Sequence, residues 1–314
     1  MTSTADSDLY AQAVGGLLDD GSETGTFVGR LLDAGWAEFA AEDPESAVRV
    51  LFEEQGCRAA ASRALDLVVA QAGGLPLEPD LAVVHPFPGK PAAQPNPDGT
   101  VVLDGLLLAG IPAAVRIVAW SEDLIVSGPL ARLEMTPISG LDPTLGISRI
   151  QGSLSPDSAV PSDRRVILTA ARRALAHELL GLAAAMLTIT VRQVGERRLF
   201  QRRLAEFQTV KHRLAEVRVS IDGARSALDL AWASNDALTA DVAKALCGKA
   251  ALLSAKHSQQ LCGAIGFTVE HPLPRLVRRA NVMDALYGSA AAIEEELGGR
   301  LLNERAIPRL PTPW

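Results

Sequence analysis

The sequence predicts a mainly α-helical protein with a small β-rich domain in the middle of the chain. Apolar residues in the C-terminal half recur every three or four positions, as at Val210, Leu214, Val217 and Ile221, which is the repeat of a helix with one buried face. Residues 74–160 instead combine proline, glycine and short β-branched runs, which favour strands. A chain of 314 residues that is 48% hydrophobic and 21% charged is globular, with one large core or two to three small domains.

The first part of the chain, residues 1–75, predicts a small N-terminal helical domain. Gly15-Gly16 and Asp43-Pro44 are typical helix breaks that separate its periodic segments. The expected helices are Leu9–Leu18, Thr26–Phe39, Pro44–Gln55 and Cys57–Ala72.

Residues 76–160 predict a middle β-domain, because short β-branched and aromatic runs alternate there with Pro- and Gly-containing loops. The expected strands are Asp80–Val84, Thr100–Asp104, Ala113–Trp120, Asp123–Val126, Leu130–Met135 and Ser148–Leu154.

Residues 161–305 predict a bundle of long antiparallel helices of the four-helix type. The apolar stripe that predicts it is ordinarily a packed core, so it gives no information about a ligand. The expected helices are Asp163–Val194, Arg203–Ser234, Asp236–Cys262, Pro272–Tyr287 and Ser289–Leu302. Residues 306–314 predict an extended tail.

Composition argues against several classes of function. The chain has 37 acidic and 30 basic residues and a net charge of −7, which argues against nucleic-acid binding. Cys57, Cys247 and Cys262 lack the spacing of a metal site and fit free thiols in a reducing compartment. The first 29 residues contain no Lys or Arg, unlike an export signal, and the longest apolar run has 13 residues, fewer than the roughly 20 that cross a bilayer. We therefore expect a cytoplasmic protein without a membrane segment or a metal.

Two segments carry the most specific pattern, ERRLFQRRLAEFQTVKHRLAEV from Glu196 and QLCGAIGFTVEHPLPR from Gln260. Arg197 and Phe200 stand three residues apart in the first segment, and Gln260, Gly263 and Ala264 stand in the second. A guanidinium can bind a pyrophosphate with paired hydrogen bonds, and a glycine lets backbone N–H groups approach phosphates closely. The alternative is that Arg197 belongs to a solvated basic face with its neighbouring arginines, Arg198, Arg202 and Arg203.

These segments resemble the C-terminal signature of the acyl-CoA dehydrogenase family over about half the chain, Asp163 to Arg300. The resemblance is closest to the short non-catalytic subunits of actinobacterial heterotetrameric steroid acyl-CoA dehydrogenases. It implies that family's fold in a shortened form, with a trimmed N-terminal helical domain, a middle β-domain and a C-terminal bundle. It also implies that one edge of the chain contacts FAD held by a neighbouring subunit. The residues expected to make these contacts are Arg197, Phe200, Phe207, Gln260, Gly263 and Ala264, the last in place of the family's second glycine.

The resemblance also locates two positions at which relatives carry the catalytic Glu, and neither holds a carboxylate here. One is Tyr287, followed by Gly288 and Ser289, and the other is Ala171, 26 residues before Arg197. A phenol with a pKa of about 10 is a poor base at neutral pH. Two other carboxylates are candidate substitutes: Glu178, about 10 Å along the helix from Ala171, and Glu270, which we expect to sit at a helix start.

The β-domain lacks the residues that hold a flavin ring in active relatives. Their Thr-Glu-Pro loop and Trp-Ile-Thr strand correspond here to HPFPGKPAAQPN from His85 and LLLAGIPAAVRIVAW from Leu106.

The resemblance therefore implies an α₂β₂ heterotetramer in which a full-length paralogue supplies the Glu and the flavin cradle. The substrate would be a bulky, steroid-derived acyl-CoA, the electron acceptor an electron-transfer flavoprotein, and this chain alone would be inactive. Two alternatives stay open. One is a homomeric dehydrogenase with Glu270 or Glu178 as a relocated base, and the other is a non-enzymatic helical interaction module.

Overall fold

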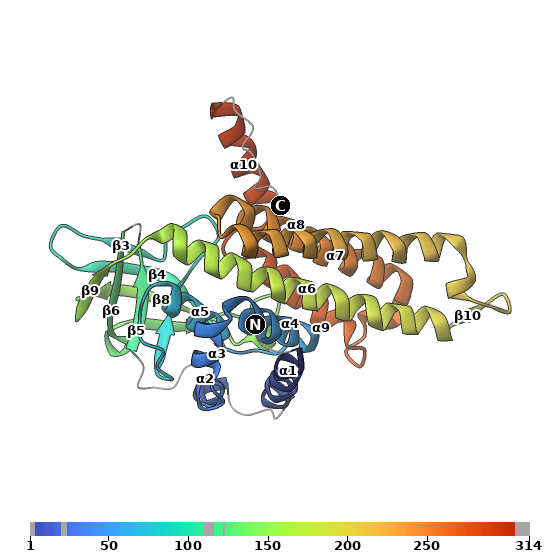
Figure 1. Cartoon of the computed structure of the whole chain (residues 1–314), viewed down its shortest axis with the longest axis horizontal. Helices are drawn as coiled ribbons and strands as arrows, with labels where there is room; N and C mark the ends of the chain where they lie inside the picture. The colour runs from blue at the N-terminus through green and yellow to red at the C-terminus, as the bar shows by residue number, and fades with distance from the viewer. Residues whose placement is uncertain (1–3, 20–23, 110–115, 122, 305–314) are drawn as a thin grey trace. The chain divides into compact units, whose positions relative to one another are not determined.

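The protein is described by a computed structural model in which residues 4–19, 24–109, 116–121 and 123–304 are placed (Figure 1). The chain folds as two compact units, one formed by residues 1–55 and 60–174 and the other by residues 56–59 and 175–314. Most of the N-terminal helical region and the strands up to residue 161 therefore share a unit, while the division of the chain at residues 75 and 160 stays a prediction.

The N-terminal helices are α1 (Thr4–Asp19), α2 (Thr24–Asp33), α3 (Trp36–Glu42), α4 (Pro44–Arg58) and α5 (Ala64–Ala72). The single helix expected over residues 26–39 is wrong, because Gly35 has a left-handed φ of 84° and separates α2 from α3. The helix expected from Cys57 is also wrong. Helix α4 continues to Arg58, Ala59 then takes a φ of 47°, and α5 begins only at Ala64.

The strands before α6 (Arg164–Glu196) form two sheets in the first unit. The first has the order β1 (Leu81–Val83), β5 (Arg116–Trp120), β6 (Leu124–Pro129) and β9 (Ser158–Pro161). The second has the order β2 (His85–Pro86), β4 (Val101–Leu107), β8 (Ser148–Leu154) and β7 (Glu134–Pro137), with β3 (Ala93–Pro95) also on β4. Buried residues of both sheets, such as Ile117 and Val126 in one and Leu103 and Ile150 in the other, form a common core, as in face-to-face sheet packing.

Several of the expected strands coincide with or overlap observed strands. Strand β8 has the expected bounds, Ser148–Leu154. The strand expected over Leu130–Met135 is wrong in its first part, because the N–H of Leu133 bonds to the carbonyl of Leu130 and closes a 3₁₀ turn, Leu130–Arg132. Its last two residues lie in β7. Residues 113–115 of the expected strand Ala113–Trp120 lie outside the described part, and β5 is described from Arg116.

The second unit is the helical bundle. Its helices are the C-terminal part of α6 (Arg164–Glu196), then α7 (Gln208–Ser234), α8 (Ala237–Cys262), α9 (Leu273–Ala285) and α10 (Ala290–Glu304). Helices α7 and α8 pack along each other, and the Asp236 side chain caps α8 by accepting from the N–H of Thr239 at 3.2 Å. The expected helix start at Arg203 is wrong: a hairpin of β10 (Arg198–Leu199) and β11 (Arg202–Arg203) and the 3₁₀ turn Leu204–Glu206 precede α7. The predicted tail, 306–314, lies outside the described residues.

Helix α6 is the one described helix that is long and apolar enough to span a bilayer by length and composition. Within its most apolar 18-residue window, 67% is buried inside the protein. That degree of burial is typical of the core helix of a bundle.

Candidate functional site

The β10–β11 hairpin presents Phe200 to solvent. Phe200 and Gln201 form its two-residue turn with φ angles of 50° and 62°, the pattern of a type I′ turn, which favours Asn and Gly. A bulky aromatic residue in the left-handed region is uncommon and points to a functional constraint. The Phe200 side chain is 87% exposed, so the turn carries a large apolar ring that makes little contact with its own chain.

Arg197 is joined to the end of α8 by a specific contact. Its Nη1 donates a hydrogen bond to the carbonyl oxygen of Cys262 at 3.1 Å. Gly263 follows with a φ of 65°, and a Cβ built on it would lie 3.2 Å from the same Nη1. A side chain there would therefore be strained and would crowd the guanidinium. The structure thus brings Arg197 and Gly263 together, and the bond occupies one of the five N–H donors of the guanidinium.

The other predicted contact residues lie on the segments that Arg197 joins. Gln260 is exposed in the last turn of α8, and Ala264 is exposed in the 3₁₀ turn Gly263–Phe267. Phe207 has a different setting, because it is half-buried just before α7 with the guanidinium of Arg202 5.3 Å from its ring centroid. Phe207 therefore contacts the side chain of Arg202.

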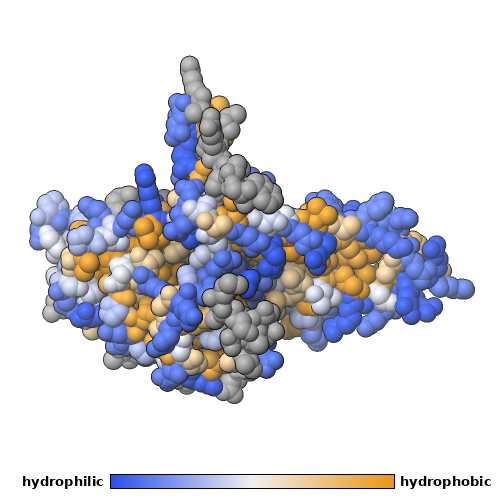
Figure 2. All heavy atoms as spheres, in the orientation of Figure 1, coloured by the Kyte–Doolittle hydropathy of each residue, from blue (hydrophilic) through white to orange (hydrophobic). Residues whose placement is uncertain are grey.

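The hairpin end of the bundle is positively charged. Arg197, Arg198, Arg202 and Arg203 are all exposed, and Figure 2 shows a mainly hydrophilic surface where Figure 1 places β10. Glu206 accepts from the backbone N–H of Arg203 at 3.2 Å and from Nε of Arg202 at 3.3 Å. The first of these bonds, followed by the second, holds the pKa of Glu206 below its usual range. The side chain of Arg202 is therefore paired with Glu206. Arg197 instead binds the carbonyl of Cys262, the residue before Gly263.

Tyr287, which the resemblance places at one of the family's base positions, has a buried side chain. It has a φ of 57° and is followed by Gly288 with a φ of 102°. Beneath this turn, the fully buried Lys244 donates to the carbonyl oxygens of Asp284 at 3.0 Å and Gly288 at 3.3 Å. The carboxylate of Asp284 accepts from the N–H of Ala290 at 3.1 Å. The turn is thus held on both sides of Tyr287.

The remaining base candidates lack the surroundings of a general base. Ala171 is fully buried and offers a methyl group. Glu178 is buried, and its Oε1 lies 3.9 Å from Nη1 of the equally buried Arg279, so the two form a buried ion pair. Glu270 is exposed, and hydrogen bonds from its own backbone N–H and from Thr268 hold its pKa below the usual range.

Glu270 lies three residues before Leu273, the first residue of α9, close to the helix start expected from the sequence. The ring Nδ1 of His271 accepts from the N–H of Leu273 at 3.2 Å. The helix start is therefore capped by an imidazole.

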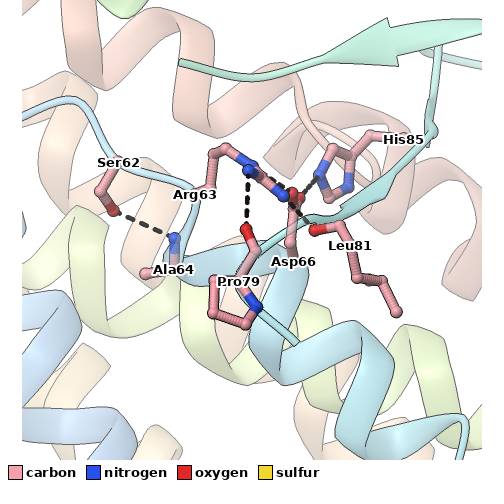
Figure 3. Close-up of polar contacts among 7 residues, drawn as sticks. All are labelled: Ser62, Arg63, Ala64, Asp66, Pro79, Leu81 and His85. Carbon is pink, nitrogen blue, oxygen red and sulfur yellow. Dashed lines mark hydrogen bonds and ion pairs between the residues drawn. The ribbon is translucent and has the colours of Figure 1, made fainter. Parts of the chain in front are cut away.

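In the first unit, a buried ionic cluster joins Arg63 and Asp66 to His85, the first residue of the segment that the resemblance aligns with the Thr-Glu-Pro loop (Figure 3). Asp66 accepts from Nε of Arg63 at 3.0 Å and bonds Nε2 of His85 at 2.8 Å. Arg63 also donates to the carbonyl oxygens of Pro79 and Leu81. The side chain of His85 is fully buried, so it is used internally rather than offered to a ligand.

Sequence reasoning missed Lys244 and the carbonyl of Cys262. The position of Lys244 among apolar residues of a helix could have predicted a buried ammonium group, and a buried ammonium group needs hydrogen-bond partners. The carbonyl bound by Arg197 had no signal, because any residue type can supply a carbonyl group.

Residues 165–302 match the acyl-CoA dehydrogenase C-terminal domain model. This part of the chain is similar to the C-terminal domain of acyl-CoA dehydrogenases. It is 29% identical over 207 residues to the acyl-CoA dehydrogenase IpdE2 of Mycobacterium tuberculosis, and the match covers 64% of this chain and 60% of that protein. The matched region thus spans less than two thirds of this curated relative.

Two solved structures have the same fold. One is a variant of the Tcur3481-Tcur3483 steroid ACAD, with a TM-score of 0.78 and 22% identity over 96% of this chain and 99% of the other. The second is the ChsE4-ChsE5 complex from Mycobacterium tuberculosis, with a TM-score of 0.75 and 18% identity over 98% of this chain and 99% of the other. The predicted fold class, mainly α with a small β domain, is confirmed.

Proposed function

We propose that this chain is a non-catalytic subunit of a heteromeric, FAD-dependent acyl-CoA dehydrogenase. The observation that carries the proposal is the contact of Arg197 with the Cys262 carbonyl beside Gly263, on an exposed edge of the bundle. The family base positions hold Tyr287 and Ala171 instead of a carboxylate. The chain therefore keeps groups suited to a cofactor and lacks a group suited to proton abstraction.

The residues at this edge fit the phosphate end of FAD rather than its reactive ring. When bound, FAD accepts the hydride that leaves the β-carbon of an acyl-CoA. The guanidinium of Arg197 would donate to a phosphate, and the unobstructed backbone at Gly263 would allow close approach. The exposed rim formed by Phe200, Gln260 and Ala264 would border the bound group. The partner subunit would supply the carboxylate and hold the flavin ring.

The chain's own β-domain does not fit a flavin. In the position of the Thr-Glu-Pro loop, His85 points into the core and is bonded to Asp66, which is itself bonded to Arg63 (Figure 3). A hydroxyl donor for a flavin ring is missing at that position. This supports a role in which FAD belongs to the partner.

The names of the similar structures support the partner and the substrate class. Tcur3481-Tcur3483 and ChsE4-ChsE5 are each named as two proteins, and the first is named a steroid ACAD. We therefore propose a full-length acyl-CoA dehydrogenase as partner in an α₂β₂ assembly and a steroid-derived acyl-CoA as substrate. An electron-transfer flavoprotein would accept the electrons.

Arg197→Ala tests the proposal in the assembled complex. Loss of a charge-assisted hydrogen bond costs about 1.5–3 kcal/mol, so the FAD affinity should fall roughly 10- to 150-fold. The measurement is FAD remaining per complex after dialysis, with Arg218→Ala as the control, since Arg218 pairs with Asp222 on the exposed face of α7. Unchanged FAD retention in Arg197→Ala would contradict the assigned role.

A further inference from the structure

The loop between α8 and α9 carries a row of exposed large apolar side chains. Ile265, Phe267 and Val269 alternate along it and are 46%, 64% and 96% exposed. Val269 is a valine with almost all of its side chain in water. We refer to these three residues as the apolar loop face.

The loop that bears this face is held by the bundle. Gly266 lies between the exposed residues and is buried, and a Cβ built on it would lie 2.9 Å from Cβ of Cys262 and 3.2 Å from Leu273. The backbone N–H and the hydroxyl of Thr268 both donate to the carbonyl of Ile265 at 3.1 Å. Gly266 thus packs against the bundle, while the side chains of Ile265, Phe267 and Val269 remain exposed to solvent.

The apolar loop face is continuous with the proposed cofactor edge. Gly263 and Ala264 stand directly before Ile265 in the same 3₁₀ turn, Gly263–Phe267. Arg197 binds the carbonyl of Cys262 just before that turn. If a partner subunit presents FAD to Gly263, its surface must also come within contact distance of the next residues of the turn.

We propose that Ile265, Phe267 and Val269 form a docking surface for the full-length partner subunit, beside the shared cofactor. This inference rests on the proposed function and adds a protein contact that does not require FAD. Residues 263–269 contain no charged side chain, and the cores of protein interfaces are likewise depleted in charge and enriched in aromatic residues. A contiguous exposed apolar patch is typical of an interaction site. The arginines of the hairpin would lie at the polar rim.

Val269→Asp and Phe267→Asp test the surface. Each places a charge in the proposed interface core and should weaken association with the partner about tenfold or more. Val219→Asp is the matched control, because Val219 on α7 is the same residue type, is 71% exposed and lies outside this loop. We expect it to change association less than about twofold.

The readout is the dissociation constant of the FAD-free complex, measured by sedimentation with each full-length acyl-CoA dehydrogenase from the same genome that co-purifies with this chain. Urea unfolding should give the same midpoint for all three variants, since all three positions are exposed. Equal weakening by Val269→Asp and Val219→Asp, or no weakening by either, would overturn the docking surface. Self-association of this chain that is lost in Val269→Asp would assign the surface to a second copy and also overturn it.

The shared-cofactor proposal and the docking-surface proposal can be contradicted independently of each other. If Arg197→Ala loses FAD while Val269→Asp still associates normally, the shared cofactor stands and the docking surface is wrong. If Val269→Asp breaks the complex while Arg197→Ala keeps FAD, the surface stands without the cofactor role.

Discussion

The ammonium group of Lys244 lies 3.0 Å from the carbonyl oxygen of Asp284, at the end of α9. It also lies 3.3 Å from the carbonyl of Gly288, on the other side of Tyr287. The last carbonyls of a helix have no intrahelical partners, and here a buried charged donor from α8 satisfies two carbonyl groups around one turn. The contact explains how Tyr287 can keep a left-handed φ of 57°.

Lys244→Met should destabilise the chain by removing this donor. Leaving a buried carbonyl without a partner costs on the order of 1–3 kcal/mol, and two carbonyl groups depend on Lys244. Urea unfolding measures the loss. Lys249→Met is the control, because Lys249 forms an exposed pair with Glu294 and such pairs contribute less than about 1 kcal/mol. Equal stability of the two variants would contradict the role of Lys244.

Gly56→Ala and Gly223→Ala should change stability in opposite directions. Gly56, in the last turn of α4, is packed so that an added Cβ would lie 2.2 Å from the carbonyl oxygen of Glu178. Backbone atoms cannot move aside easily, so this change should cost about 1–3 kcal/mol or more. Gly223 is exposed in α7 with nothing within 4 Å of an added Cβ, and alanine should stabilise that helix by about 0.5–1 kcal/mol. The free energies of unfolding test both signs.

Glu178→Gln separates a structural role from the relocated-base alternative. Removing one partner of a buried ion pair such as Glu178–Arg279 costs about 3–5 kcal/mol, so this variant should be destabilised. Glu216→Gln is the control, since Glu216 is exposed and pairs with His257. A Glu178→Gln chain with full stability that had lost a dehydrogenase activity of its own would support the alternative instead.

The contacts of Glu206 with Arg202 and Arg203, next to the hairpin, should weaken at acidic pH. The pKa of Glu206 lies below its usual value of 4.5 because the N–H of Arg203 and the side chain of Arg202 bind its ionised form. The stabilisation is therefore present at pH values above the unfolded pKa and is lost as the pH falls through the folded pKa. NMR of the Arg202 Nε–H should show faster solvent exchange below that pH, and Glu206→Gln should remove the pH dependence. A pH-independent exchange rate in the unchanged chain would contradict it.

The sequence predicted the long elements well, because their signals are local. The bounds of β8 match, and α8 was expected one residue too early, since Asp236 is its cap rather than its first residue. The hairpin before α7 was missed because Leu204 and Phe207 continue the helical apolar repeat, and its turn contains Phe200 and Gln201 in place of Asn and Gly.

The site was predictable in part. The resemblance named Arg197 and Gly263, and the structure places them side by side. Their contact with a cofactor stays a prediction. The Lys244 contacts join residues 40 or more positions apart, and the pattern of one chain gives no signal for such a pairing.

The central claim is a cofactor shared between two different subunits, and FAD content with subunit stoichiometry tests it most directly. The chain is purified alone and then co-expressed with a full-length acyl-CoA dehydrogenase from the same genome. We expect no FAD in the chain alone and one FAD per heterodimer in the complex. A yellow, active homo-oligomer of this chain alone would contradict the account.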